Sequence, residues 1–213
     1  MRHNARPLGV LAAVAKGLLL LWTVPAHSTQ PPSPKQTQAL VRHMAEDAQE
    51  LFKLYEQEQH LAHSLCRANS SLEWLRGNLG PRVKDLRALH GTMTRMEREL
   101  QDITLHQSNL HPPDAAILHR LRGAHMKVRG LLAHLQDTME ARGIVPSTIP
   151  PPRGPAASKV FQQKLRGCRV LWNYARFVAK LSARMERMER TRARREERGR
   201  RRGWRRGWRT TRP

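Results

Sequence analysis

The chain has 213 residues and a formal net charge of +22, a balance that would suit a nucleic-acid-binding protein. The charge is uneven, however: residues 184–213 contribute +10 and residues 1–28 contribute +3, which leaves +9 for the body between them. The body is therefore only moderately basic. Since no later segment is apolar over the roughly 20 residues that a membrane anchor needs, an anchored protein is excluded.

Residues 1–28 have the organisation of a secretory signal peptide. Two arginines form a basic start, the stretch 8–24 is mostly apolar, and small residues around Ala26 suit cleavage. We therefore expect a secreted, extracellular protein.

Four later stretches show the hydrophobic period of amphipathic helices, and no stretch shows the two-residue period of a strand. In the clearest of them the apolar positions recur in steps of three and four, at Leu86, Leu89, Met93, Met96, Leu100 and Ile103. The predicted helices span residues 35–60, 83–105, 114–142 and 158–188.

The links between these predicted helices are long, short and long. Residues 61–82 carry several turn signals, residues 106–113 form a short break, and residues 143–157 hold five prolines. A short link joins antiparallel neighbours, whereas a long link can return the chain along the bundle so that consecutive helices run the same way. The sequence therefore predicts an all-α fold, a long-chain four-helix bundle of up-up-down-down topology, over residues 29–190.

The chain has two cysteines, Cys66 and Cys168. In an oxidising compartment an even number of cysteines favours a disulfide over metal binding or nucleophilic chemistry. We predict one bridge between them, with two free buried thiols as the alternative.

The fourth predicted helix starts with Phe161-Gln-Gln-Lys164, an aromatic side chain one turn before a cation. Together with residues 51–55 and 129–132, this stretch resembles the leukaemia inhibitory factor and oncostatin M branch of the interleukin-6-type cytokines. The resemblance covers about residues 30–183. It implies a monomeric cytokine that is not an enzyme and uses no cofactor or metal.

The resemblance implies two receptor-binding faces. The family's Phe-x-x-Lys pattern, here Phe161 and Lys164, contacts the specific receptor, either leukaemia inhibitory factor receptor or oncostatin M receptor. An aromatic anchor beside a cation suits an interface, although a plug of the bundle end by Phe161 is the alternative. Pairing this receptor with the shared transducer, glycoprotein 130, would activate Janus kinases and STAT proteins inside the cell.

In the family the first and third helices bind glycoprotein 130. Gln36 and Gly130 match the family pattern on this face, and a packing glycine is the alternative for Gly130. His43 and His134 lie at positions of the same face where the family has other polar residues. The resemblance also implies a disulfide from the first crossover loop to the last helix.

Residues 191–213 form an arginine-rich extension, which we expect to be disordered and cleavable. Some precursors of the family end in a basic extension that proteases trim, which suggests processing near Arg195 or Arg202. Asn69 begins the single acceptor sequon and is a predicted glycosylation site. The tail could also bind heparan sulfate.

The basic tail supports one alternative function: a secreted cationic protein that binds heparan sulfate, nucleic acid or bacterial membranes in the manner of an antimicrobial protein. Catalysis has no comparable support, because the sequence lacks a glycine-rich phosphate loop and a Ser, His and Asp arrangement. His60 and His63 are one turn apart but have no third ligand near them in sequence.

Overall fold

The computed structural model describes residues 33–67, 72–75, 82–146 and 159–210, and within these ranges no strand occurs. Four long helices and two short ones make up the described chain. They are α2 (Pro34–Glu58), α3 (His63–Arg67), the 3-10 helix η2 (Glu73–Leu75), α4 (Val83–Ser108), α5 (Ala116–Glu140) and α6 (Val160–Thr210).

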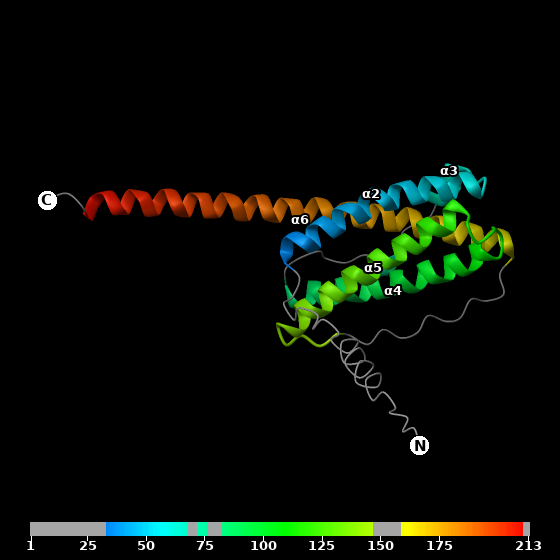
Figure 1. Cartoon of the computed structure of the whole chain (residues 1–213), viewed down its shortest axis with the longest axis horizontal. Coiled ribbons are helices and arrows are strands. Elements are labelled where there is room, and N and C mark those ends of the chain that lie inside the picture. Colours follow the sequence, from blue (N-terminus) through cyan, green and yellow to red (C-terminus); the bar gives the residue numbers. More distant parts are fainter. Residues whose placement is uncertain (1–32, 68–71, 76–81, 147–158, 211–213) are drawn as a thin grey trace, which may run out of the picture. The chain divides into compact units, whose positions relative to one another are not determined.

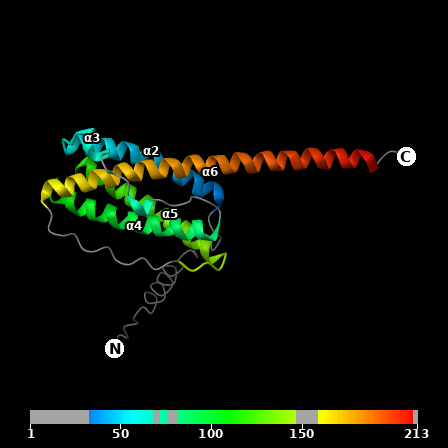
Figure 2. The same cartoon turned by 180° about the vertical axis from the view of Figure 1, so that it is seen from behind.

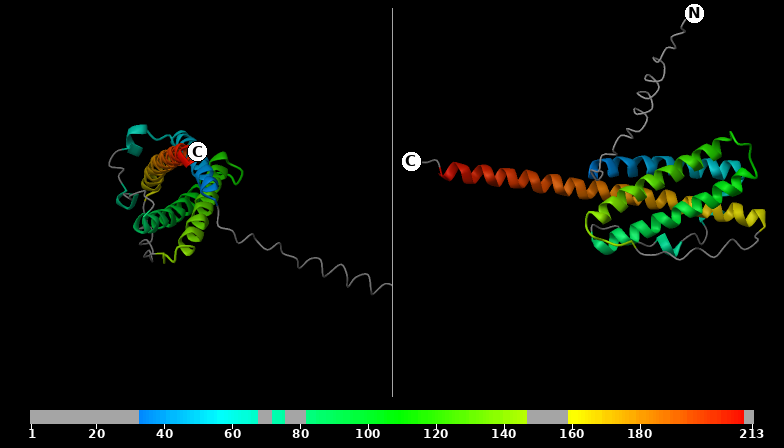
Figure 3. Two further views of the ribbon diagram at one scale, coloured as in Figure 1. Left: turned by 90° about the vertical axis from the view of Figure 1, so that its left-hand side faces the viewer. Right: turned by 60° about the horizontal axis from the view of Figure 1, so that its bottom comes forward.

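The directions of the long helices confirm the predicted topology. α2 and α4 run one way and α5 and α6 run the other way (Figure 1). α2 packs against both α5 and α6, and α4 packs mainly against α5. The end-on view in Figure 3 shows the four long helices around a common centre. The fold is therefore an up-up-down-down bundle.

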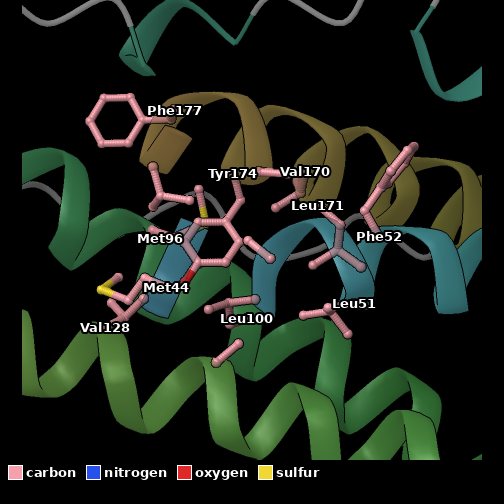
Figure 4. Packing of buried hydrophobic residues seen from close by; sticks show 14 of the residues in the cluster. Met44, Leu51, Phe52, Met96, Leu100, Val128, Val170, Leu171, Tyr174 and Phe177 are labelled. Carbon is pink, nitrogen blue, oxygen red and sulfur yellow. The ribbon is translucent and has the colours of Figure 1, made fainter. Parts of the chain in front are cut away.

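The core consists of the apolar stripes that the sequence predicted. Tyr174 of α6 lies beside Met44 of α2 and Met96 and Leu100 of α4 (Figure 4). Burial raises the pKa of Tyr174 far above its usual range, so this hydroxyl stays protonated. The predicted stripe of α4 is fully buried only from Met93 onward, whereas Leu86 and Leu89 are half-buried.

The helix ends show one cap that the sequence analysis did not anticipate and correct one predicted helix start. Ser33 and Gln36 form a capping box at the start of α2, with their side chains bonded to each other's backbone amides at 3.3 and 2.8 Å. The predicted helix start at Asp114 is wrong. Residues 112–115 form a turn instead, closed by the Ala115 amide on the Pro112 carbonyl, and α5 begins after Ala115 without a side-chain cap.

A disulfide joins Cys66 of α3 to Cys168 of α6, as predicted, and both residues are fully buried. The two Cα atoms are 5.3 Å apart, and 102 residues separate the cysteines in sequence. Figures 1 and 2 show α3 beside the end of α2 and the first half of α6. The bridge therefore attaches the long first connection to the last helix.

Helix α6 continues to Thr210, whereas the sequence predicted disorder from residue 191. The last buried side chain of α6 in the described part of the chain is Ser182, and the half-buried Met185 just after it still packs against the core. Arginine favours helix, and Arg192 pairs with Glu196 one turn later at 3.0 Å. None of the described helices is long and apolar enough to cross a membrane.

Candidate functional site

The first turn of α6 presents an aromatic side chain and a cation on the outside of the bundle. Phe161 is 53% exposed, and Lys164, one turn later, is half-buried. Phe161 therefore does not plug the core, which removes that alternative interpretation. A large exposed aromatic ring on a rigid helix is the type of residue that anchors protein interfaces.

A network of buried and part-buried polar side chains is hydrogen-bonded to the backbone of this first turn. The Tyr55 hydroxyl donates to the Lys164 carbonyl oxygen at 3.2 Å and accepts from Gln107 Nε2 at 3.2 Å. Gln59 Nε2 donates to Gln107 Oε1 at 2.8 Å and lies 3.1 Å from His111 Nε2. The ends of α2 and α4 thus share hydrogen bonds with the start of α6.

Burial also keeps the Tyr55 hydroxyl available as a donor. Burial raises the pKa of Tyr55 far above its usual range, and the hydrogen bond from Gln107 only partly opposes the shift. The hydroxyl therefore remains protonated at neutral pH. Buried polar groups in a hydrogen-bonded network favour a single packing of the helices that carry them, because leaving one group unpaired costs about 1–3 kcal/mol.

Gly167 makes room for Tyr55. A Cβ atom built on Gly167 would overlap the Tyr55 hydroxyl oxygen and lie 3.0 Å from its Cζ. Tyr55 of α2 can therefore come this close to α6 only because residue 167 has no side chain. The sequence pattern did not reveal this contact, because the two residues are far apart in the chain.

Gly167→Ala should lower the free energy of unfolding by about 1–3 kcal/mol, because the added methyl group must displace the Tyr55 ring. The loss should appear even though alanine is intrinsically the better helix former by about 1 kcal/mol. Urea denaturation followed by circular dichroism measures the change. Gly123→Ala is the matched control, since a Cβ there meets nothing within 4 Å, and it should not destabilise the protein. Equal effects of the two substitutions would contradict the proposed contact.

A groove of about 200 Å³ lies beside this turn, between α4 and α6. At its wall the buried carboxylate of Glu99 accepts from Arg166 at 2.8 Å. Burial, and secondarily the charge of Lys164, lower the pKa of His106, which also lines the groove. The surface next to Phe161 therefore combines an apolar hollow with an ion pair.

The second predicted face lies where α2 and α5 pack together. Thr37 Oγ1 of α2 and His134 Nδ1 of α5 are 3.2 Å apart, and a Cβ on Gly130 would lie 3.6 Å from Leu40 Cδ2. That distance is ordinary van der Waals contact, so helix packing does not require glycine at residue 130. His134 and Gly130 therefore share one seam with the start of α2.

The other two residues predicted for this face have different surroundings. Gln36 is exposed, but its side chain caps α2, which the sequence analysis did not anticipate. His43 is exposed, and its Nδ1 is 3.7 Å from Glu46 Oε2 on the same helix. The structure adds Met126 of α5, which is 62% exposed and lies one turn before Gly130. The sequence analysis overlooked this methionine, although it lies only four residues before Gly130.

The LIF / OSM family profile matches residues 35–184 of the sequence. The chain belongs to the LIF / OSM family. It is thus an interleukin-6-type cytokine, and proteins of this class bind cell-surface receptors. The match begins in the first turn of α2 and ends in α6 close to the last buried residue, so the later turns of α6 lie outside it. A comparison with curated proteins gives no match.

Nothing in the described part of the structure tests three further predicted sites of this LIF / OSM family member. Asn69 lies outside the residues that the structure describes. Arg195 is exposed on α6, and only the helical backbone is described at Arg202. The predicted glycosylation and processing therefore stay predictions.

Proposed function

We propose that the chain is a secreted cytokine that pairs glycoprotein 130 with leukaemia inhibitory factor receptor or oncostatin M receptor and so triggers JAK/STAT signalling. The observation that carries the proposal is the exposed Phe161 beside Lys164, within the part of the chain that matches the family. Within the family, the arginine-rich extension favours an oncostatin M type of cytokine.

Phe161 and Lys164 contact the specific receptor. An exposed phenylalanine gains roughly 25 cal/mol for each Å² of apolar surface that a partner covers. The Tyr55 hydrogen bond holds the backbone of this turn in place, so little ordering remains to be done on binding. Lys164 adds a directed charge for a receptor carboxylate or carbonyl.

The seam of α2 and α5 contacts glycoprotein 130. Gly130 lets a receptor backbone come close, and the neighbouring Met126 offers a flexible apolar side chain that adapts to the partner. Gln36, His43 and His134 are the polar groups of this face. The two faces use different helices, so one molecule can hold two receptors at once.

Binding to the separate ectodomains of the three receptors tests the proposal. We expect the refolded chain to bind glycoprotein 130 and at least one of the other two, and to form a ternary complex with both in size-exclusion chromatography. Cells that carry the pair should then phosphorylate STAT. Failure to bind any of the three ectodomains would overturn the proposed function.

Gly130→Ala separates a receptor contact from a packing role. Because the space for a methyl group exists, the substitution should raise the free energy of unfolding by up to about 1 kcal/mol through helix propensity. It should nevertheless lower the affinity for glycoprotein 130 by roughly tenfold, about 1.4 kcal/mol. Surface plasmon resonance measures the affinity, and unchanged binding to the specific receptor is the internal control. Loss of stability would instead indicate a packing glycine.

We further propose that residues 1–28 are removed on secretion, that Asn69 is glycosylated, and that α6 is trimmed near Arg195 or Arg202. Intact-mass analysis of protein secreted from animal cells should show a carboxyl terminus between residues 190 and 202. Retention of Pro213 would contradict the trimming.

A further inference from the structure

A second hollow lies on the opposite side of α6 from the groove beside Phe161, between α2, α3 and α6. Its volume is about 350 Å³. Four cations from three helices line it: Lys53 of α2, Arg67 of α3, and Arg176 and Lys180 of α6. All four are exposed. We call this hollow the basic groove.

The indole ring of Trp172 fixes two of these cations. The guanidinium carbon of Arg67 is 4.4 Å from the ring centroid of Trp172, and that of Arg176 is 5.4 Å from it. Phe52 packs on the same indole at 5.2 Å between ring centroids. Cation–π contacts of this kind hold the guanidinium groups in place without neutralising their charge. The basic groove therefore has a rigid aromatic wall with positive groups around it.

The side chains that line the basic groove carry an excess of positive charge. No carboxylate is among the described side chains that line it. Arg176 and Lys180 are one helical turn apart, an arrangement of like charges that destabilises an isolated helix. A site that concentrates one sign of charge in a concave surface attracts a ligand of the opposite sign.

We propose that the basic groove binds a sulfated polysaccharide of the heparan sulfate class. The guanidinium groups of Arg67 and Arg176 present forked donors that match sulfate oxygens, and Lys53 and Lys180 supply point charges on either side. The apolar face of a sugar ring can pack on the indole wall. The proposal concerns the bundle itself and so goes beyond both receptor pairing and a role for the arginine-rich tail.

A linear sulfated polymer fits better than an acidic peptide or a membrane surface. The positive side of α6 continues past the basic groove, since Arg187, Arg194 and Arg198 follow Lys180 at nearly whole numbers of turns and are all exposed. At 1.5 Å per residue, the row from Arg176 to Arg198 is about 33 Å long. A regularly charged linear chain can follow such a row, starting from the groove.

The NMR resonances of the tryptophan indoles distinguish sugar binding in the basic groove from sugar binding to the arginine-rich tail. In the whole chain labelled with ¹⁵N-tryptophan, a heparin tetrasaccharide should shift the Trp172 indole signal in a saturable manner. Trp204 and Trp208 report binding to the tail separately. Trp172→Phe assigns the resonance.

Two quadruple variants with the same loss of charge provide the comparison. The groove variant carries Lys53→Gln, Arg67→Gln, Arg176→Gln and Lys180→Gln. The control variant replaces two lysines and two arginines that are exposed elsewhere: Lys35→Gln, Arg42→Gln, Arg82→Gln and Lys84→Gln. The groove variant should weaken binding measured at Trp172 at least tenfold, whereas the control should stay within twofold. Both should keep the response of the tail tryptophans and the binding to glycoprotein 130.

Three outcomes would overturn the proposal. An unmoved Trp172 signal would show that the sugar binds only the tail, and equal losses in the two variants would show an effect of net charge alone. An equal shift with polyglutamate or with anionic lipid vesicles would show that the basic groove does not select a sulfated sugar.

Discussion

Replacing Phe161 and Lys164 together by alanine should lower the affinity for the specific receptor at least about 100-fold, which corresponds to about 2.7 kcal/mol. Interface anchors of this type commonly cost 2 kcal/mol or more when truncated. Phe161 is exposed in the free protein, so its loss removes no core packing. Surface plasmon resonance with each receptor ectodomain measures the affinity, and circular dichroism should show unchanged helicity.

A matched pair on the same helix provides the control. Arg187→Ala together with Met188→Ala also removes one cation and one exposed apolar side chain from α6, far from its first turn. This variant should bind the specific receptor normally. Both double variants should bind glycoprotein 130 as the unaltered chain does. Full receptor binding by the Phe161 and Lys164 variant would remove the first face from the proposal.

The double substitution Cys66→Ala and Cys168→Ala should lower the free energy of unfolding by about 4–5 kcal/mol in the chain-entropy description of a loop of this length. The bridge closes a loop over 102 residues, which restricts the unfolded chain strongly. Urea denaturation should show a lower midpoint and a steeper dependence on urea, because the unlinked chain exposes more surface.

Reduction of the unaltered protein provides the control for the substitutions themselves. Dithiothreitol should produce the same loss of stability without changing any residue. A variant that is destabilised by less than 1 kcal/mol would show that packing of α3 on α6 alone holds the first connection in place.

The four long helices were predictable because each buries a single stripe, and a stripe leaves a regular period in the sequence. Val41, Met44 and Ala48 of α2 and Leu118 and Leu121 of α5 recur in such steps of three and four and are all buried. The link lengths then determined the topology. Local competition explains the misplaced start of α5, because the turn at residues 112–115 satisfies backbone groups that the predicted helix would have used.

The support beneath the candidate site could not be predicted in the same way. Gln107 is fully buried, yet it stands in the sequence as one more polar residue at the end of a helix. Its partners Tyr55 and Gln59 are about 50 residues away and come close only in the folded bundle. The resemblance to known cytokines identified Phe161 and Lys164. The contacts of Tyr55 with Gly167 and with the Lys164 carbonyl oxygen, which help to hold the start of their helix, are visible only in the three-dimensional structure.

Because α6 extends beyond the core, much of its positive charge lies on turns that are not part of the packed interior. Among the described side chains of this helix, full burial ends at Ser182 and contact with the core ends with the half-buried Met185, while the positive residues continue beyond both. A protease that cuts after that point removes charge and leaves the packed interior intact. The uncut cytokine would be retained by anionic polymers near the cell that makes it, and the shortened one would diffuse farther while still reaching the same receptors.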